Sequence, residues 1–376
     1  MTSDRDTVHI TRSLVSLNTT NPPGNEAQAA SFLSNILEKH GFVHKRAAFA
    51  EHRASLVAYL GPMTEKPAIC FCGHMDTVPL GQAPWQHDPF AGEVDGDRIY
   101  GRGASDMKSG LAAMILMAQR LAKEPSLKAG LCLVFTAGEE TFCQGARHLA
   151  GVTGALPKAG AMVVCEPTSN RPLVGHRGAI HLEVQTKGIS AHASMPELGE
   201  NAIYKAAEAA LKLRELDFGL PAHPLLGKPT LNVGTISGGV NINSIPDQAT
   251  MGVDIRIIPG QDPQTVLASL RSLLGEQTEV RLLDHAPSVA TDPQNPWVQE
   301  VFEIVETITG HSQGPAAAPY FTDASVLTPA LGNPPTLILG PGEAEMAHKT
   351  DEYCYISKIE EAVEIYTEIA RRWCCS

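Results

Sequence analysis

The chain has 376 residues, of which 43% are hydrophobic, and its formal net charge is −12 (29 basic against 41 acidic residues). This length predicts two domains or one large domain with an insertion, and the apolar content is enough for a full core. The negative charge argues against nucleic acid as a partner, because phosphate binding needs a basic patch. No segment is long and apolar enough to cross a membrane, and residues 1–6 do not resemble a signal peptide, so we expect a cytoplasmic protein.

Eight cysteines are scattered along the chain, and none forms a CxxC pair. In a cytoplasmic protein they are expected to be thiols. Cys70, Cys72, Cys132 and Cys165 fall inside strand-like runs, where cysteine usually acts as a small apolar core residue. Their spacing argues against a metal bound by cysteine.

Helix-like and strand-like segments alternate in the first part of the chain. Helical spacing of apolar residues predicts a helix over 27–40, which stops at Gly41. A second helix is predicted over 109–123, and strands over 56–60, 68–72, 131–136 and 161–165. Such alternation predicts an α/β domain with a mixed, mostly parallel sheet flanked by helices.

The pattern changes near Gly178 and returns after about Ser288. Between them we predict a strand over 180–187, a helix over 201–213, strands over 231–236 and 249–257, a helix over 263–274 and a strand over 278–283. This β-α-β-β-α-β order is the ferredoxin-like α+β motif. Helices over 297–308 and 358–373 and a strand over 335–339 then resume the α/β pattern. We therefore predict a discontinuous domain (1–177 and 288–376) that carries an inserted domain (178–287).

Two adjacent carboxylates, Glu139 and Glu140, follow the apolar strand 131–135. Side by side at the end of a buried strand, they repel each other and lose solvation, and a cation is the simplest compensation. If one glutamate binds a metal ion, the other is well placed to take a proton from a metal-bound water. This pair predicts a hydrolase site.

Other ligand-type residues follow neighbouring strands. His74 and Asp76 come after the strand 68–72, and a histidine held by a carboxylate is a recurring feature of metal sites, although a surface turn is the plainer alternative. Asp106 stands at the start of the helix 109–123, where it could be only an N-cap. Glu166 and His348 follow further strands. Because ligands of open α/β sheets bind at the carboxyl ends of strands, we expect these side chains to meet.

Together these segments resemble the signature blocks of the acetylornithine deacetylase / succinyl-diaminopimelate desuccinylase / carboxypeptidase G family of co-catalytic metallopeptidases. The blocks occur in the family's order and cover nearly the whole chain. They are GHMDTVP at 73–79, GRG at 101–103 with DMK at 106–108, Glu139-Glu140, Glu166-Pro167-Thr168 and Ala347-His348.

The resemblance implies a site for two zinc ions, with cobalt or manganese as possible substitutes. His74 and Glu166 would bind one metal, Glu140 and His348 the other, and Asp106 would bridge them. Asp76 would orient His74, and Glu139 would be the general base that activates a metal-bridging hydroxide. Nitrogen and oxygen donors of this kind suit zinc.

For the inserted domain, the resemblance implies a lid that also forms a homodimer. His192 would reach an active site, that of the dimer partner, to stabilise the oxyanion, whereas by its sequence alone it would be a turn residue. Asn243 would contact the substrate. Arg256, or Arg177 as a weaker candidate, would clamp a substrate carboxylate, although Arg256 could equally be a structural salt-bridge partner.

Thr322 lies in a loop that resembles one near the family's substrate. Tyr320-Phe321 replaces the usual glycine-rich pair there, so strict acetylornithine or succinyl-diaminopimelate chemistry is not assigned. Glu166 matches the glutamate that is typical of the family's deacylases and carboxypeptidases, where aminopeptidases have aspartate.

We therefore expect a metal-dependent amidohydrolase that deacylates an N-acyl amino acid or a related small amide. A carboxypeptidase or dipeptidase is the alternative, with a short peptide as substrate. A non-catalytic binding protein on this fold is disfavoured, because all five presumed ligands, Asp76 and Glu139 are present.

Overall fold

The computed structural model describes residues 4–62 and 66–376 and divides the chain into two compact units. Unit 1 comprises 1–175, 290–317 and 322–376, and unit 2 comprises 176–289 with the short segment 318–321. The boundaries expected from sequence lie two residues from these, but the sequence did not separate 318–321 from its neighbours. Residues 1–3, on which the expectation of no signal peptide partly rests, lie outside the described part. No helix of the described residues is both long and apolar enough to cross a membrane.

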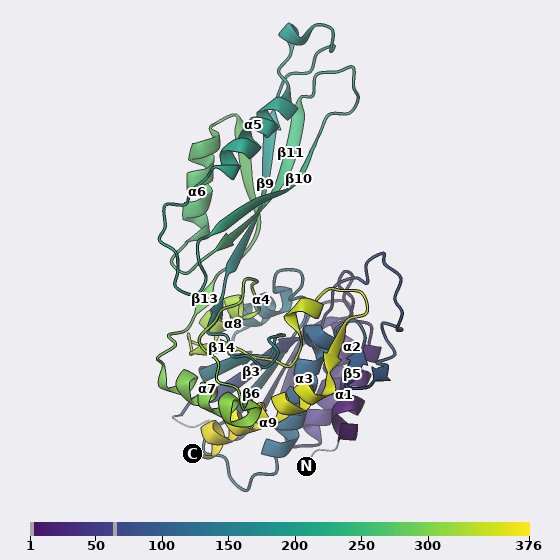
Figure 1. The fold of residues 1–376 in the computed structure, drawn as a ribbon, viewed down its shortest axis with the longest axis vertical. Helices are drawn as coiled ribbons and strands as arrows, with labels where there is room; N and C mark the ends of the chain where they lie inside the picture. Colours follow the sequence, from purple (N-terminus) through teal and green to yellow (C-terminus); the bar gives the residue numbers. More distant parts are fainter. Residues whose placement is uncertain (1–3, 63–65) are drawn as a thin grey trace. The chain divides into compact units, whose positions relative to one another are not determined.

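Unit 1 is built on a six-stranded, mixed sheet (Figure 1). Its central strands are parallel, because β3 pairs in parallel with both β6 and β7, and β14 pairs in parallel with β7. β2 joins antiparallel to β6, and β1 antiparallel to β2. In spatial order the strands are β1 (Val43–Ala50), β2 (Arg53–Leu60), β6 (Leu131–Thr136), β3 (Ala68–His74), β7 (Ala159–Val164) and β14 (Thr336–Ile338). This confirms the predicted fold class.

Helices cover both faces of this sheet. The crossovers β3–α3–β6 and β6–α4–β7 run in opposite directions across it, so their helices lie on opposite faces if both are right-handed. α3 packs beside α1 and α9, and α4 contacts α8. The helices are α1 (Asp4–Ser16), α2 (Glu26–Glu38), α3 (Ser109–Leu121), α4 (Gln144–Gly151), α7 (Pro296–Thr309), α8 (Ala324–Ala330) and α9 (Ile356–Cys375).

Short elements organise the loops of unit 1. A three-stranded sheet joins β15 (Tyr353–Tyr355), β5 (Arg98–Tyr100) and β4 (Val94–Asp95), and the irregular helical turn η1 (Ala104–Lys108) leads into α3. A further turn, η3, spans Ala344–Met346. β8 (Gly175–His176) and β13 (Val289–Ala290) pair where the chain passes between units.

Unit 2 has a four-stranded antiparallel sheet in the order β10-β11-β9-β12, which is the strand order of a ferredoxin-like fold. Alternate residues of β9 and β11 are buried, as expected for a sheet with one covered face. They pack against the apolar faces of α5 and α6. The elements are β9 (Gly178–Lys187), η2 (Pro196–Leu198), α5 (Ala202–Arg214), β10 (Thr230–Gly238), β11 (Gln248–Ile257), α6 (Pro263–Leu274) and β12 (Thr278–Ala286).

Several elements of unit 1 escaped the sequence analysis, among them β1, α1, α4, α8 and the short strands β4, β5 and β15. β1 lies at the edge of the sheet and most of its residues are exposed or half-buried, so it lacks the apolar alternation of an inner strand. α1 is rich in polar residues, and α4 is only eight residues long. The eight cysteines are all free thiols, and seven of them are buried.

We predict that Leu182→Ala in β9 destabilises the protein by about 2–5 kcal/mol, because it leaves a cavity at a fully buried position. Leu283→Ala in β12 is the matched control, since Leu283 is 53% exposed and its loss should change stability by less than about 0.5 kcal/mol. Urea unfolding followed by circular dichroism measures both. Equal losses would contradict the assignment of the core face.

Candidate functional site

Asp106 lies between two histidines in unit 1. Its Oδ1 is 3.0 Å from Nε2 of His74, and its Oδ2 is 3.5 Å from Nε2 of His348. His74 ends β3, Asp106 lies in η1 before α3, and His348 follows η3. Three distant segments of the chain thus meet at one carboxylate.

Each histidine also faces a glutamate. Nε2 of His74 is 3.8 Å from Oε1 of Glu166, and Nε2 of His348 is 3.0 Å from Oε1 of Glu140. The five side chains therefore form a chain of contacts, Glu166–His74–Asp106–His348–Glu140. One ligand atom from each of His74, Asp106 and Glu140 lies within 4.8 Å of the others, close enough to bind one ion.

Asp76 holds His74 and the turn of Glu139 and Glu140 in position through hydrogen bonds. Its carboxylate accepts backbone N–H groups of Glu139 (3.1 Å) and Glu140 (3.3 Å) and the side-chain amide of Asn21 (2.9 Å). Its backbone carbonyl lies 2.9 Å from Nδ1 of His74. When Nδ1 carries the proton it donates to this carbonyl, which leaves the Nε2 lone pair facing Asp106. Asp76 thus fixes both the histidine and the turn that carries the two glutamates.

The loop before His348 is packed tightly onto its neighbours. A side chain at Gly342 would overlap the Ser105 carbonyl oxygen, so only glycine fits there. Ser105 in turn donates its hydroxyl to the carbonyl of Glu343 at 2.9 Å. Backbone bonds from Thr168 and Ser169 hold the segment after Glu166 against the same loop. These contacts fix the loops of Asp106, Glu166 and His348 relative to one another.

The site carries an excess of buried negative charge. Burial raises the pKa of Glu139 and of Glu166 well above the ordinary value, and neighbouring carboxylates raise both further. Hydrogen bonds to Asp106 and Glu140 raise the pKa of His348 to about 10. For His74, burial lowers the pKa, but the charges of Glu166 and Asp106 outweigh it and raise the pKa well above the usual range. A positive charge bound among these carboxylates would therefore be stabilised.

These residues suit divalent metal ions. Two imidazoles and three carboxylates offer nitrogen and oxygen donors at one place, the donor set that zinc and similar metals prefer in proteins. Glu139 is 6% exposed and lies beside Glu140 on the same turn. The Glu139 carboxylate forms no hydrogen bond with another side chain of the described residues. It is therefore available to take a proton.

The sequence also picked out His192 and Asn243, and both lie in unit 2. Their segments pair with each other, because His192 forms a bridge with Ser244 and the Ala193 N–H donates to the Asn243 carbonyl at 3.0 Å. His192 is exposed, and its Nδ1 lies 2.7 Å from the Ser194 hydroxyl. A role for either residue in the site stays a prediction.

The predicted carboxylate clamps are engaged within unit 2. Arg256 makes a bidentate pair with Asp254, with both N–O distances at 2.9 Å, which is the structural alternative that the sequence left open. Arg177 donates to the Leu226 carbonyl. In unit 1, Thr322 is buried and its hydroxyl accepts the Ala324 N–H at the start of α8. Substrate contacts by these residues remain predictions.

Two buried acidic residues went unassigned at the sequence level. Asp323 accepts a hydrogen bond from the Thr136 hydroxyl at the end of β6, and burial raises its pKa to about 6. Glu352 pairs with Arg102 next to Asp106. Asp323 directly follows Thr322, and Glu352 lies close after His348, but an acidic residue in a loop gives no sign of its burial. The placement of Glu352 four residues after His348 was the available signal.

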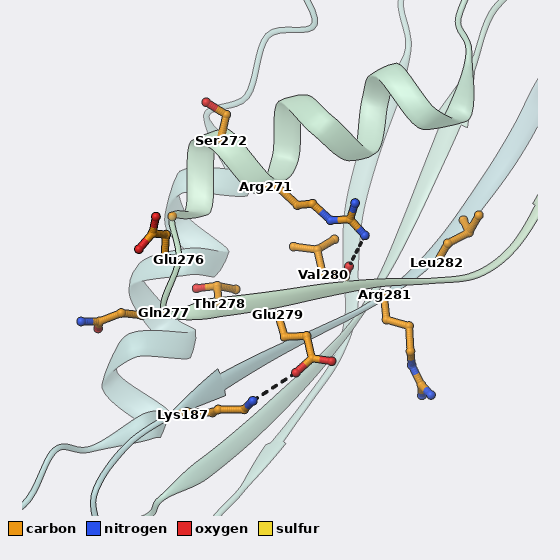
Figure 2. A pocket seen from close by; sticks show the side chains of 11 residues that line it. Lys187, Arg271, Ser272, Glu276, Gln277, Thr278, Glu279, Val280, Arg281 and Leu282 are labelled. Atoms are coloured by element: carbon orange, nitrogen blue, oxygen red, sulfur yellow. Dashed lines mark hydrogen bonds and ion pairs between the residues drawn. The ribbon is translucent and has the colours of Figure 1, made fainter.

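A hollow of about 770 Å³ in unit 2 contains none of the predicted site residues; it lies between the end of α6 and β12 (Figure 2). Two of its basic side chains are engaged: Lys187 pairs with Glu279 at 3.2 Å, and Arg271 donates to the Val280 carbonyl at 3.0 Å. The remaining carboxylate, Glu276, is exposed and stands alone, so this hollow offers no evident chemistry.

Comparison with known proteins places the geometry in context. The profile of the peptidase family M20/M25/M40 matches residues 70–372. A protein of Staphylococcus epidermidis named probable succinyl-diaminopimelate desuccinylase is 29% identical, with 99% of this chain and 98% of the relative covered. The acetylornithine deacetylase of Proteus mirabilis is 32% identical over 93% of this chain and 90% of its own.

A solved structure shares the fold across its full length. It is described as an M20 family metallo-carboxypeptidase from Sulfolobus solfataricus, and it superposes with a TM-score of 0.80 at 19% identity, covering 98% of this chain and 99% of its own. At that identity the likeness shows the fold alone. The family resemblance seen in the sequence is confirmed by the profile and by the relatives together.

Proposed function

Because this chain belongs to the peptidase family M20/M25/M40, a family of hydrolases of amide and peptide bonds, we propose that it is a two-metal deacylase of N-acyl amino acids or related small amides. The observation that carries the proposal is the position of Asp106 between two histidines, each of which faces its own glutamate. This is a donor set for two ions that share one carboxylate.

In this proposal His74 and Glu166 would hold one metal, Glu140 and His348 would hold the other, and Asp106 would be shared between them. The contact distances support the pairing, since each histidine lies within 3.8 Å of its glutamate. Zinc is the metal we propose, with cobalt or manganese as substitutes, because the donors are imidazole nitrogen and carboxylate oxygen.

Glu139 is the proposed general base. When bound, the metals lower the pKa of a water molecule to about 7 and polarise the substrate carbonyl. Glu139, which is 6% exposed, would take the proton of the attacking water and return it to the leaving amine. Asp76 keeps Glu139 in place by accepting its backbone N–H.

The deacylase assignment rests on two supports. Both sequence relatives are named for the removal of an acyl group from an amino acid, at 29% and 32% identity. Glutamate at position 166 matches the deacylases and carboxypeptidases of the family. A carboxypeptidase or dipeptidase is the second candidate, because Glu166 matches the family's carboxypeptidases as well as its deacylases.

We further propose a homodimer through unit 2, in which His192 stabilises the oxyanion in the partner's site and Asn243, Arg177, Arg256 and Thr322 contact substrate. Apolar side chains support the interface. Tyr204 and Leu211, seven residues apart on one face of α5, are 70% and 52% exposed, and Ile236 of the edge strand β10 is 54% exposed.

We predict that Glu139→Gln leaves metal binding intact and lowers kcat by roughly 100-fold or more, because it removes the base and no ligand. Metal content by atomic absorption and steady-state rates measure the two effects. Glu140→Gln is the matched neighbour and should lose metal as well as activity. A Glu139→Gln enzyme with full turnover would remove this residue as the base.

The function itself is tested by a substrate screen. We expect the zinc-loaded protein to hydrolyse one class among N-acetyl, N-succinyl and N-formyl amino acids, to lose activity after exhaustive chelation, and to regain it with zinc or cobalt. A dipeptide panel runs in parallel, and activity confined to that panel would favour the second candidate. Activity that survives complete chelation would end the metal proposal.

Mixed dimers test the role of His192. A Glu139→Ala subunit supplies His192, and a His192→Ala subunit supplies Glu139, so each mixed dimer would contain one complete site. Random mixing should then restore about a quarter of the wild-type rate, while each variant alone is nearly inactive. No recovery in mixed dimers that form by native mass spectrometry would count against catalysis across the interface.

A further inference from the structure

We infer that the buried pair Arg102–Glu352 is a positioning device that pre-forms the site by holding the backbone of Asp106. The inference rests on the proposed metal site. Neither side chain touches the ligand atoms, so both act through Asp106 and its neighbours.

Glu352 is fully buried and uses both oxygens on the loop that leads to Asp106. Oε1 accepts the backbone N–H groups of Ser105 (2.8 Å) and Asp106 (2.9 Å), and Oε2 accepts that of Gly103 (2.9 Å). Gly103 has a left-handed backbone with φ 84°. Three backbone donors within four residues therefore converge on one carboxylate, which is an arrangement that fixes the path of the chain.

Arg102 completes this contact and carries it to two other loops. Its Nη1 donates to Oε2 of Glu352 at 2.6 Å and to the Lys349 carbonyl at 3.2 Å, and its Nη2 donates to the Pro79 carbonyl at 3.2 Å. The guanidinium also lies 5.1 Å from the centre of the Trp85 ring. Arg102 is 1% exposed, so these bonds form away from water.

The pair thus joins the three segments that bring His74, Asp106 and His348 together. Pro79 lies five residues after His74, Lys349 directly follows His348, and Glu352 bonds to Asp106 itself. A shift in any of these loops would separate donors that now lie 3.0 to 3.5 Å apart. Groups that orient metal ligands in this way typically change metal affinity 10–100-fold when they are lost.

The decisive variant is Glu352→Gln, whose amide group keeps the size but turns a donor toward Arg102 and the loop N–H groups. In the metal-free protein, hydrogen exchange at the Gly103, Ser105 and Asp106 amides should become faster. Zinc affinity, measured by chelator competition, should fall by about 10–100-fold with the number of bound ions unchanged. Glu140→Gln, which removes a ligand, should instead lower that number.

Val301→Ala controls for a general loss of stability. Val301 is fully buried in α7, a helix of the same unit that packs against α9, and takes part in none of the hydrogen bonds described above, so this variant should keep wild-type zinc affinity and loop protection. If Glu352→Gln fails to fold, Glu352→Asp keeps the charge but withdraws the carboxylate by one methylene, and the same changes are expected in milder form.

Wild-type zinc affinity and unchanged exchange in the folded Glu352 variants would overturn the inference. So would an equal loss of affinity in Val301→Ala. If the wild-type protein binds no zinc, the proposed function fails, yet the exchange experiment on the metal-free chain still decides whether Glu352 holds the loop.

Discussion

The site buries more negative charge than the protein's own cationic side chains can neutralise. Asp106, Glu139, Glu140 and Glu166 converge where only two imidazoles face them. Charges in such a place interact strongly because water screens them poorly. The nearby basic side chains are already engaged, since Arg102 holds Glu352 and Lys108 donates to the Leu17 carbonyl. A bound cation resolves this imbalance, and the fold is arranged around that requirement.

The sheet explains how such distant residues meet. Strands β6, β3, β7 and β14 are neighbours and run in parallel, so the segments after them leave at one edge. Those segments carry Glu139-Glu140, His74 with Asp76, Glu166 and finally His348. Asp106 does not follow a strand of this sheet: it lies in η1, directly before α3. Its backbone therefore has to be held in position by other contacts. This is the residue that Glu352 holds through three backbone bonds.

Much of this could be predicted from sequence, because apolar runs mark inner strands and ligand-type residues follow them. The ferredoxin-like order of unit 2 followed from the alternation in β9 and β11. The edge strand β1 could not, since its side chains face solvent and show no periodicity. The Arg102–Glu352 pair was also beyond reach, because 250 residues separate its members and no local pattern reveals that both are buried.

Substrate choice is harder to infer than metal chemistry, and unit 2 shows why. Side chains that bind a metal ion must lie close to one another, so their mutual contacts identify them. Arg256, by contrast, already has a bidentate partner in Asp254, so a substrate carboxylate would have to compete with that carboxylate. The segments of His192 and Asn243 are bonded to each other, so they act as one structural element. Under the proposed substrate contacts, a change at Arg256 or Asp254 would alter carboxylate recognition, while the element that carries His192 and Asn243 would stay the same.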